Sequence, residues 1–208
     1  MTPPKSKHIW LIDAGHGGMI DGEYQTAGKR SPVWPDGSQY FEGVGNRQIA
    51  SKLMDMLDAY SIPYFDILDG SQEDVQLYDR VRKANQYQKI FGNCIYVSIH
   101  SDAFTKESAN GYSVYTSEGQ TKSDAIAQIF IDNMIVNFPE HKLRKDTRDG
   151  DYDKEAQFYV LRKTTSPAIL IENFFMTNER ECKLLMSETG QDRIVKCHFE
   201  SIRKISFG

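Results

Sequence analysis

The sequence predicts a single α/β domain, residues 1–208, in which a mostly parallel mixed sheet is covered by helices on both faces. Three observations support this prediction. Short apolar runs typical of buried strands alternate with longer segments whose apolar residues recur at helical spacing. No internal repeat, low-complexity tract or linker divides the chain. Its 208 residues are enough to bury a core and fall near the usual size of one domain.

The first half of the chain predicts two strands, two helices and one long loop. Residues 8–12 form a short apolar run that leads into a glycine-rich turn, which is typical of a buried strand. Residues 19–41 are rich in Gly, Pro, Ser and aromatic side chains without a clear period, and predict one long loop that shapes access to a site. Apolar residues on one helical face predict helices over 46–60 and 73–88, with a second strand at 64–68 between them.

The middle of the chain continues the alternation. Residues 94–99 form a nearly continuous apolar strand, and alternating side chains predict another strand over 111–116. Residues 123–137 have the apolar spacing of an amphipathic helix. The segment 139–155 is dense in charge and poor in apolar residues, so we expect a second long surface loop.

The last part of the chain predicts two strands followed by two helices. The apolar runs at 158–161 and 168–171 are both interpreted as strands, the second of them fully buried. Helical spacing of apolar residues predicts helices over 179–186 and 192–205. These elements complete a chain of strands and helices in alternation.

Composition excludes several classes of protein. The net charge of −4 argues against a nucleic-acid partner, which would favour a basic face, and no apolar run approaches the ~20 residues that span a bilayer. Three cysteines without CxxC spacing exclude a cysteine zinc site and make a disulfide framework unexpected. We expect these cysteines to be buried, unreactive thiols, and they are Cys94, Cys182 and Cys197.

Three predicted buried strands lead into residues that carry chemistry. His16 follows the first strand closely, while His100 and Glu172 come directly after later strands. If these strands are parallel, their carboxyl ends share one sheet edge and the three side chains become neighbours. Each alone has a structural explanation, such as a surface histidine or a capping glutamate, but three at three strand ends favour a site. Structural roles are assigned to the other histidines, His8, His141 and His198.

Two histidines, one carboxylate and a water molecule make a common catalytic zinc site. The sequence leaves the third ligand open, because spacing alone does not choose between the candidates. Glu42 is favoured on local grounds, since it stands just before a predicted helix that fixes its carboxylate. Glu172 would then be free to act as general base. The candidate carboxylates are Asp13, Glu23, Glu42, Asp102 and Glu172.

Several short segments resemble those of one enzyme family, in the same order. On these segments the sequence is similar to the zinc-dependent N-acetylmuramoyl-L-alanine amidases of the amidase-3 type, which are peptidoglycan hydrolases. Each segment alone is a weak signal, but together they cover nearly the whole chain. The segments are 13–18 (DAGHGG), Glu42 with Asn46, Arg80 with Ala84 and Asn85, 98–103 (SIHSDA), Gly111, 160–162 (VLR) and 167–178 (PAILIENFFMTN).

The resemblance implies specific roles for four residues. His16, Glu42 and His100 would hold one Zn²⁺ per chain, and Glu172 would be the catalytic glutamate and general base for zinc-activated water. The bond cleaved would be the amide between the lactyl group of N-acetylmuramic acid and L-alanine of the stem peptide. Two alternatives from the residues alone are a zinc peptidase or deacetylase acting on another amide, and a non-catalytic binder of cell-wall glycopeptide.

The sequence departs from the family pattern at Asp102, where Asn is common, and at Asn173, where a small or apolar residue is more usual. Neither change touches an implied ligand. We expect a monomer whose partner is peptidoglycan, with no membrane partner and no separate wall-binding module. No export signal opens the chain, so it is expected to be made in the cytoplasm and to act on the cell wall like a phage lysin, or to be a mature form lacking its leader.

Overall fold

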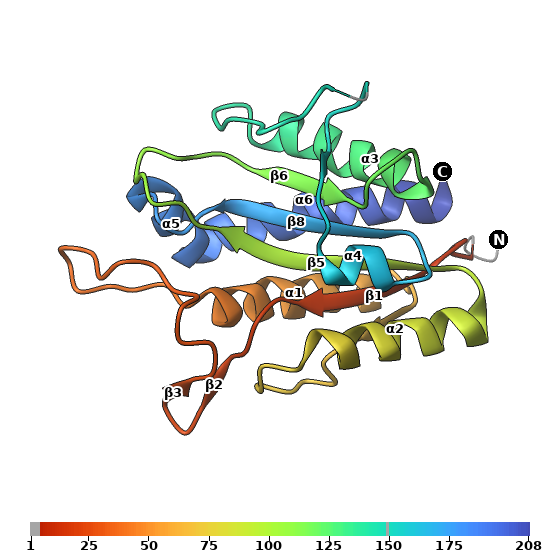
Figure 1. Cartoon of the computed structure of the whole chain (residues 1–208), viewed down its shortest axis with the longest axis horizontal. Coiled ribbons are helices and arrows are strands. Elements are labelled where there is room, and N and C mark those ends of the chain that lie inside the picture. The colour runs from red at the N-terminus through yellow and green to blue at the C-terminus, as the bar shows by residue number, and fades with distance from the viewer. Residues whose placement is uncertain (1–4, 149) are drawn as a thin grey trace.

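The computed structural model describes residues 5–148 and 150–208 and places a mixed sheet between two sets of helices (Figure 1). Strands β1, β4, β5 and β8 are parallel, β6 is antiparallel to β8, and β7 is parallel to β6. The predicted mostly parallel mixed sheet is therefore confirmed. Within the described residues the sheet has six strands, in the order β4 (Tyr64–Asp66), β1 (Ile9–Ala14), β5 (Cys94–Asp102), β8 (Ala168–Phe175), β6 (Ser113–Thr116) and β7 (Lys154–Glu155).

Helices cover both faces of this sheet, as predicted. One face packs against α1 (Glu42–Ala59), α3 (Lys122–Asn137) and α6 (Glu188–Phe207), and the other against α2 (Leu77–Phe91) and α4 (Tyr159–Lys163). Helix α5 (Glu179–Met186) lies beside the end of β8 and packs on α6. In Figure 1, α4 crosses in front of the sheet and α6 passes behind it. None of the helices in the described part of the chain is long and apolar enough to cross a membrane.

Strand β1 shows how the two faces divide the core. Trp10 and Ile12 belong to the larger apolar cluster, with α1, α3 and α6, whereas Leu11 belongs to the smaller cluster, with α2 and α4. Side chains alternate across a strand, so a strand that is covered on both faces is apolar along its whole length. This burial explains the continuous apolar runs in the sequence. The three cysteines are buried and free, as predicted.

Three strands extend beyond their predicted ends, β1 to Ala14 instead of residue 12, and in β5 and β8 this correction moves polar residues into the sheet. Strand β5 continues to Asp102 and β8 to Phe175, so His100 and Glu172 lie within strands rather than after them. The register shifts between His100 and Asp102, and Phe174 has a positive φ of 63°. An apolar run marks only the fully covered part of a strand, so polar residues that continue the ladder are missed.

Helix α1 begins four residues earlier than predicted. The helix was expected from residue 46 because Gly43 and Gly45 disfavour helix interiors, yet both lie in its first turn. A Cβ on Gly43 would stand 1.9 Å from the carbonyl oxygen of Gly17, so glycine is needed there for close packing. The prediction was wrong because these glycines serve packing against a neighbouring loop rather than ending the helix.

The segment 158–161 is not a strand. It opens the short helix α4, in which the adjacent residues Val160 and Leu161 are both buried against the α2 face of the sheet. A strand covered on one face would bury only one of two adjacent residues, and a run of four residues is too short for periodicity to separate the two possibilities. The predicted strand was therefore wrong, because the apolar run is too short to distinguish a strand from a helix.

The segment 19–41 contains a small hairpin that was not predicted. Strands β2 (Met19–Ile20) and β3 (Glu23–Tyr24) pair through a turn in which Asp21 and Gly22 have φ values of 51° and 82°. An Asp-Gly pair is the usual signal for such a turn, but strands of two residues are too short to show a period.

The bounds of four other elements differ from those predicted. Helix α2 begins at Leu77 instead of 73, β4 ends at Asp66, β6 begins at Ser113, and α6 extends over Glu188–Phe207.

Candidate active site

Two histidines and one glutamate converge at the carboxyl end of β1 and β5. The Nε2 atom of His16 lies 3.2 Å from Oε1 of Glu42, and Nδ1 of His100 lies 3.1 Å from the same oxygen. The two imidazole rings are perpendicular, with centroids 4.9 Å apart. The three potential ligand atoms all lie within 4.8 Å of one another. Residues from a loop, a helix and a strand therefore meet around one point.

The backbone around His16 is held in an uncommon conformation. His16 has a φ of 65°, and its carbonyl oxygen accepts hydrogen bonds from Arg47 at 2.7 Å and from Arg80 at 3.1 Å. Gly15 precedes it, and a Cβ at that position would stand 2.1 Å from the His100 ring. The glycine thus lets the ring of His100 approach, while the arginines fix the turn that presents His16.

A buried ion pair lies beneath this turn. Arg80 contacts Asp13 at 2.6 Å, and the side chains of both residues are at most 2% exposed. The second oxygen of Asp13 accepts hydrogen bonds from Tyr96 at 2.6 Å and Ser98 at 2.9 Å. Burial alone would raise the pKa of Asp13, but the Arg80 charge and the Tyr96 hydroxyl outweigh it and lower the pKa. Both carboxylate oxygens of Asp13 thus have partners, and Asp13 is not part of the cluster although it lines the same cavity.

Glu42 presents an ionised carboxylate to the two histidines. Burial would raise its pKa, but the close contacts and charges of His100 and His16 lower it well below the ordinary value. The Ser101 backbone N–H also donates to Oε1, at 3.3 Å. Because Glu42 is in the first turn of α1, the helix dipole favours its negative charge as well.

The cluster has the properties of a metal site. The Nε2 atom of His16 is buried and has no hydrogen-bond partner, although it lies within ion-pair distance of Glu42. A buried ring nitrogen without a partner is unfavourable unless something binds it. Two imidazole nitrogens and one carboxylate oxygen form a donor set typical of catalytic zinc, which leaves a coordination position for water or substrate. The residues therefore fit a zinc ion.

Glu172 lies beside the cluster without belonging to it. Its strand neighbours in register are His100 on β5 and Ser113 on β6, so both sides of the residue are fixed by the sheet. The side chain is half-buried as a whole, but Oε2 is fully buried and has no hydrogen-bond partner. Burial first, and then the charges of Glu42 and Asp102, raise the pKa of Glu172 well above its ordinary value. Such a carboxyl group is suited to proton transfer.

His16, His100 and Glu172 line one cavity of about 260 Å³. The cavity lies on the α2 and α4 face of the sheet, and its wall also includes Lys29 and the half-exposed ring of Phe158. The predicted convergence at the carboxyl edge of parallel strands is therefore confirmed. Two rival carboxylates, Glu23 and Asp102, take no part in the three-residue cluster, and neither do His8, His141 and His198.

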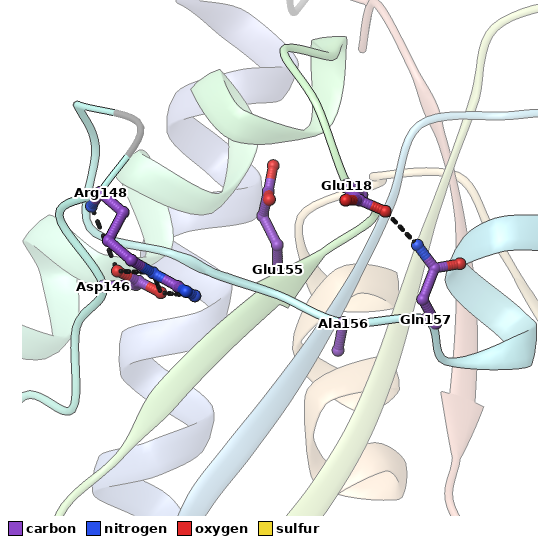
Figure 2. A pocket seen from close by; sticks show the side chains of 6 residues that line it. All are labelled: Glu118, Asp146, Arg148, Glu155, Ala156 and Gln157. Atoms are coloured by element: carbon purple, nitrogen blue, oxygen red, sulfur yellow. Dashed lines mark hydrogen bonds and ion pairs between the residues drawn. The ribbon is translucent and has the colours of Figure 1, made fainter.

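A second cavity, of about 390 Å³, lies near β7 and offers no such chemistry (Figure 2). Figure 2 shows the Arg148 guanidinium against the Asp146 carboxylate, and Gln157 donating to Glu118. No histidine or cysteine lines this cavity in the described part of the chain. The candidate active site is therefore the cavity lined by His16, His100 and Glu172, together with Glu42, which contacts both histidines.

Sequence reasoning missed the residues that support the candidate metal ligands. Arg47 carried no signal, because one charged residue on a helix usually faces solvent. Arg80 lay in a matched segment, but its hydrogen bonds to the carbonyl oxygens of Ala14 and His16 required the fold to be known. Tyr40, from the long loop, is buried and lies 3.1 Å from the Ser101 hydroxyl.

Comparisons with known proteins agree with this geometry. Residues 11–204 match the model of the Amidase_3 family, described as N-acetylmuramoyl-L-alanine amidase. The endolysin of Bacillus phage SPP1 is 25% identical over 204 residues, which cover 96% of this chain and 66% of the endolysin. AmiA of Salmonella typhimurium, an N-acetylmuramoyl-L-alanine amidase, is 27% identical over 231 residues, which cover 91% of this chain and 73% of AmiA. The structure of an N-acetylmuramoyl-L-alanine amidase from Clostridium difficile 630 superposes with a TM-score of 0.76, at 25% identity and 96% coverage of both chains.

Proposed function

Since the chain belongs to the Amidase_3 family of N-acetylmuramoyl-L-alanine amidases, we propose that it hydrolyses peptidoglycan with the help of a zinc ion. The bond cleaved is the amide between the lactyl group of N-acetylmuramic acid and L-alanine of the stem peptide. The observation that carries the proposal is the His16–Glu42–His100 cluster, whose two histidines line one cavity with Glu172. Similarity to AmiA and to a phage endolysin supports cell-wall peptidoglycan as the substrate.

His16, Glu42 and His100 hold one zinc ion in this proposal. When bound, zinc supplies Lewis acidity, which polarises the scissile carbonyl and lowers the pKa of a water molecule. The protein contributes the fixed positions of the ligands, through the arginines on the His16 carbonyl and the helix that carries Glu42. This rigid arrangement matters because catalysis depends on geometry held to a fraction of an ångström.

Glu172 moves the proton. As the water oxygen attacks the carbonyl carbon, Glu172 accepts a water proton and then donates it to the alanine nitrogen, so that the carbon–nitrogen bond breaks to give a carboxylic acid and an amine. Its raised pKa suits both steps, since a carboxylate with an ordinary pKa would be a weaker base. The sheet neighbours of Glu172 fix its approach to the same cavity as the two histidines.

The roles of base and ligand are separated by two variants. In Glu172→Gln, zinc content is expected to stay near one per chain, while release of free amino groups from peptidoglycan falls by about 10²–10⁴-fold. In His16→Ala, zinc and activity are both expected to be lost, since two protein ligands rarely hold zinc. Metal analysis and an amine-release assay measure the two properties on the same preparations.

The control is Glu188→Gln, an exposed position on α6 far along the chain from the site. It should retain both zinc and activity. Full activity in Glu172→Gln would remove the assignment of the base, and normal zinc content with full activity in His16→Ala would end the proposal of a catalytic zinc site.

A further inference from the structure

Two aspartates before β7 form a second polar centre, separate from the candidate active site. Asp151 and Asp153 stand on either side of Tyr152, in the charged segment that precedes β7. Asp153 is only 1% exposed, and its Oδ2 atom accepts a hydrogen bond of 2.5 Å from the hydroxyl group of Thr116, at the end of β6. The carboxylate of Asp151 lies against that of Asp153. A buried carboxylate and a half-buried one thus lie together at the edge of the sheet.

Both carboxylates have an oxygen that nothing in the described residues satisfies. The Oδ1 atoms of Asp151 and Asp153 are buried and lack hydrogen-bond partners. Within residues 5–148 and 150–208, no lysine, arginine or histidine nitrogen lies within 4.0 Å of either carboxylate, whereas the buried Asp13 is paired with Arg80 at 2.6 Å. Buried carboxylates are normally paired or bound to a metal ion, because an uncompensated buried charge is very unfavourable. The unpartnered oxygens therefore point to a cation.

The charges around Asp153 are negative and therefore favour a cation. Burial, followed by the direct contact with the Asp151 carboxyl group and by the charges of Asp151 and Asp124, raises the pKa of Asp153 to about 7, against the opposing effect of the Thr116 hydroxyl group. Asp124 contributes charge only, because its oxygens already accept hydrogen bonds from the backbone and hydroxyl groups of Thr121 in the capping box of α3. The remaining acceptors are the two Oδ1 atoms, and carboxylate oxygens are the ligands that hard divalent cations prefer.

We propose that Asp151 and Asp153 bind a calcium ion, which fastens the segment before β7 to the end of β6 at Thr116. Calcium is favoured over magnesium because it tolerates irregular geometry and incomplete protein ligation, with water filling the other positions. This site shares no residue with the zinc cluster, so the inference is independent of the proposed function.

Calorimetric titration of the zinc-loaded full-length chain with CaCl₂ tests the proposal. One calcium ion per chain is expected, with a Kd of about 1 mM or tighter, the range of sites with few protein ligands. Asp151→Asn and Asp153→Asn should each weaken binding by at least about tenfold. The matched control is Asp146→Asn, an aspartate of the same segment whose carboxylate is already engaged by Arg148. Terbium luminescence excited through tyrosine, competed with calcium, gives a second readout, because Tyr152 stands between the two aspartates.

Thermal unfolding at pH 8 decides the matter even if Asp153→Asn fails to fold. Without calcium, Asp151→Asn should be more stable than the wild type, because it removes the repulsion between the two carboxylates. With calcium at about 10 mM the order should reverse, since only the wild type gains binding energy. No saturable calcium binding to the wild type, or equal binding by wild type and Asp151→Asn, would overturn the proposal and leave a carboxyl pair that shares a proton.

Discussion

Gly15 and His16 show how single residues define the candidate zinc site. His16 adopts a φ of 65°, a conformation that costs most residues about 1–2 kcal/mol, and two arginines hold its carbonyl in place. Gly15 leaves room for the imidazole ring of His100, with which His16 shares the Glu42 carboxylate. The site therefore depends on a small residue and on the arginine contacts as much as on the ligands themselves.

The Gly15→Ala substitution should impair zinc binding more than folding. The added methyl group would stand 2.1 Å from Cε1 of His100, so the ring must move away from Glu42. We expect zinc affinity to fall by at least about tenfold, as for other changes that displace a metal ligand. Competition with a chromophoric chelator measures the affinity. Gly28→Ala is the control, because nothing lies within 4 Å of the added atom; equal affinities of the two variants would contradict this account of Gly15.

The sequence predicted the ligands better than it predicted their support. His16, His100 and Glu172 were found because each follows an apolar run, and the topology brings them to one cavity. Glu42 was only one of five candidate carboxylates. Its proximity to the histidines depends on a helix whose first turn contains two glycines, and the sequence does not reveal where that helix begins. The hydrogen bonds of Arg80 depend on contacts between residues distant in sequence, which periodicity does not report.

At the scale of elements, β8 connects the site to the helix α6 behind the sheet. Glu172 faces the cavity, and the next residue, Asn173, points to the opposite face, where its Oδ1 atom lies 2.9 Å from Nε2 of His198. The side-chain Nδ2 atom of Asn173 donates a hydrogen bond to the backbone carbonyl oxygen of His100 at 3.2 Å. A polar chain thus links α6 to the strand of a metal ligand. This explains Asn173, a departure from the family pattern, as a buried polar contact matched by His198.

Because of His198, the free energy of unfolding should fall in mild acid. Burial lowers its pKa to about 3, below the value of about 6.5 in the unfolded chain, so the folded state holds this histidine neutral. Its contribution is full above pH ~6.5 and is lost as pH falls towards ~3, by at most about 1.4 kcal/mol per pH unit. The measurement is the free energy of unfolding against pH for wild type and His198→Gln, taken as a difference so that other titrating groups cancel.

The difference between the two curves should narrow or reverse as pH falls from 6.5 to 4.5, because the variant lacks the group that protonates on unfolding. His8, near the start of the chain, is only partly buried, and His8→Gln serves as the control. Parallel curves for wild type and His198→Gln would show that the buried histidine does not have the lowered pKa.

The helices and strands were predicted correctly where their buried apolar residues recur at a regular spacing in the sequence. Helices α1, α3, α5 and α6 and strands β1, β5 and β8 were found because burial on one or both faces leaves an apolar pattern. Helix α4 and the β2–β3 hairpin were not, because they are too short for a period to be read. The ends of β5 and β8 were misplaced for a different reason, since the polar residues His100 and Glu172, which line the cavity, interrupt the apolar runs of these strands.

At the scale of the whole molecule, the zinc cluster connects parts of the chain that are far apart in sequence. The loop after β1, the first turn of α1 and the strand β5 supply His16, Glu42 and His100, respectively. In Figure 1 these elements meet at the end of the sheet from which β2 and β3 project. A metal ion held there would stabilise the fold as well as supply chemistry, because binding to the native state alone shifts the unfolding equilibrium.

Removing zinc should therefore lower the unfolding temperature. Free zinc at 100–1,000 times its Kd contributes about 3–4 kcal/mol, which corresponds to roughly 6–15 °C for a chain of this size. Scanning calorimetry before and after treatment with 1,10-phenanthroline, which spares calcium, measures the shift. Zinc should restore the higher temperature and magnesium should not. An unchanged unfolding temperature in metal-free protein would mean that the cluster binds no zinc in the native state.

The most direct test of the central claim is mass spectrometry of the products released from purified peptidoglycan, with zinc, with a chelator, and with zinc restored. We predict stem peptides that begin with a free L-alanine amino group and glycan strands with intact lactyl groups, lost on chelation and regained with zinc. Cleavage within the stem peptide or removal of acetyl groups would contradict the bond assigned. Release that persists without metal would contradict the zinc-dependent mechanism built on His16, Glu42, His100 and Glu172.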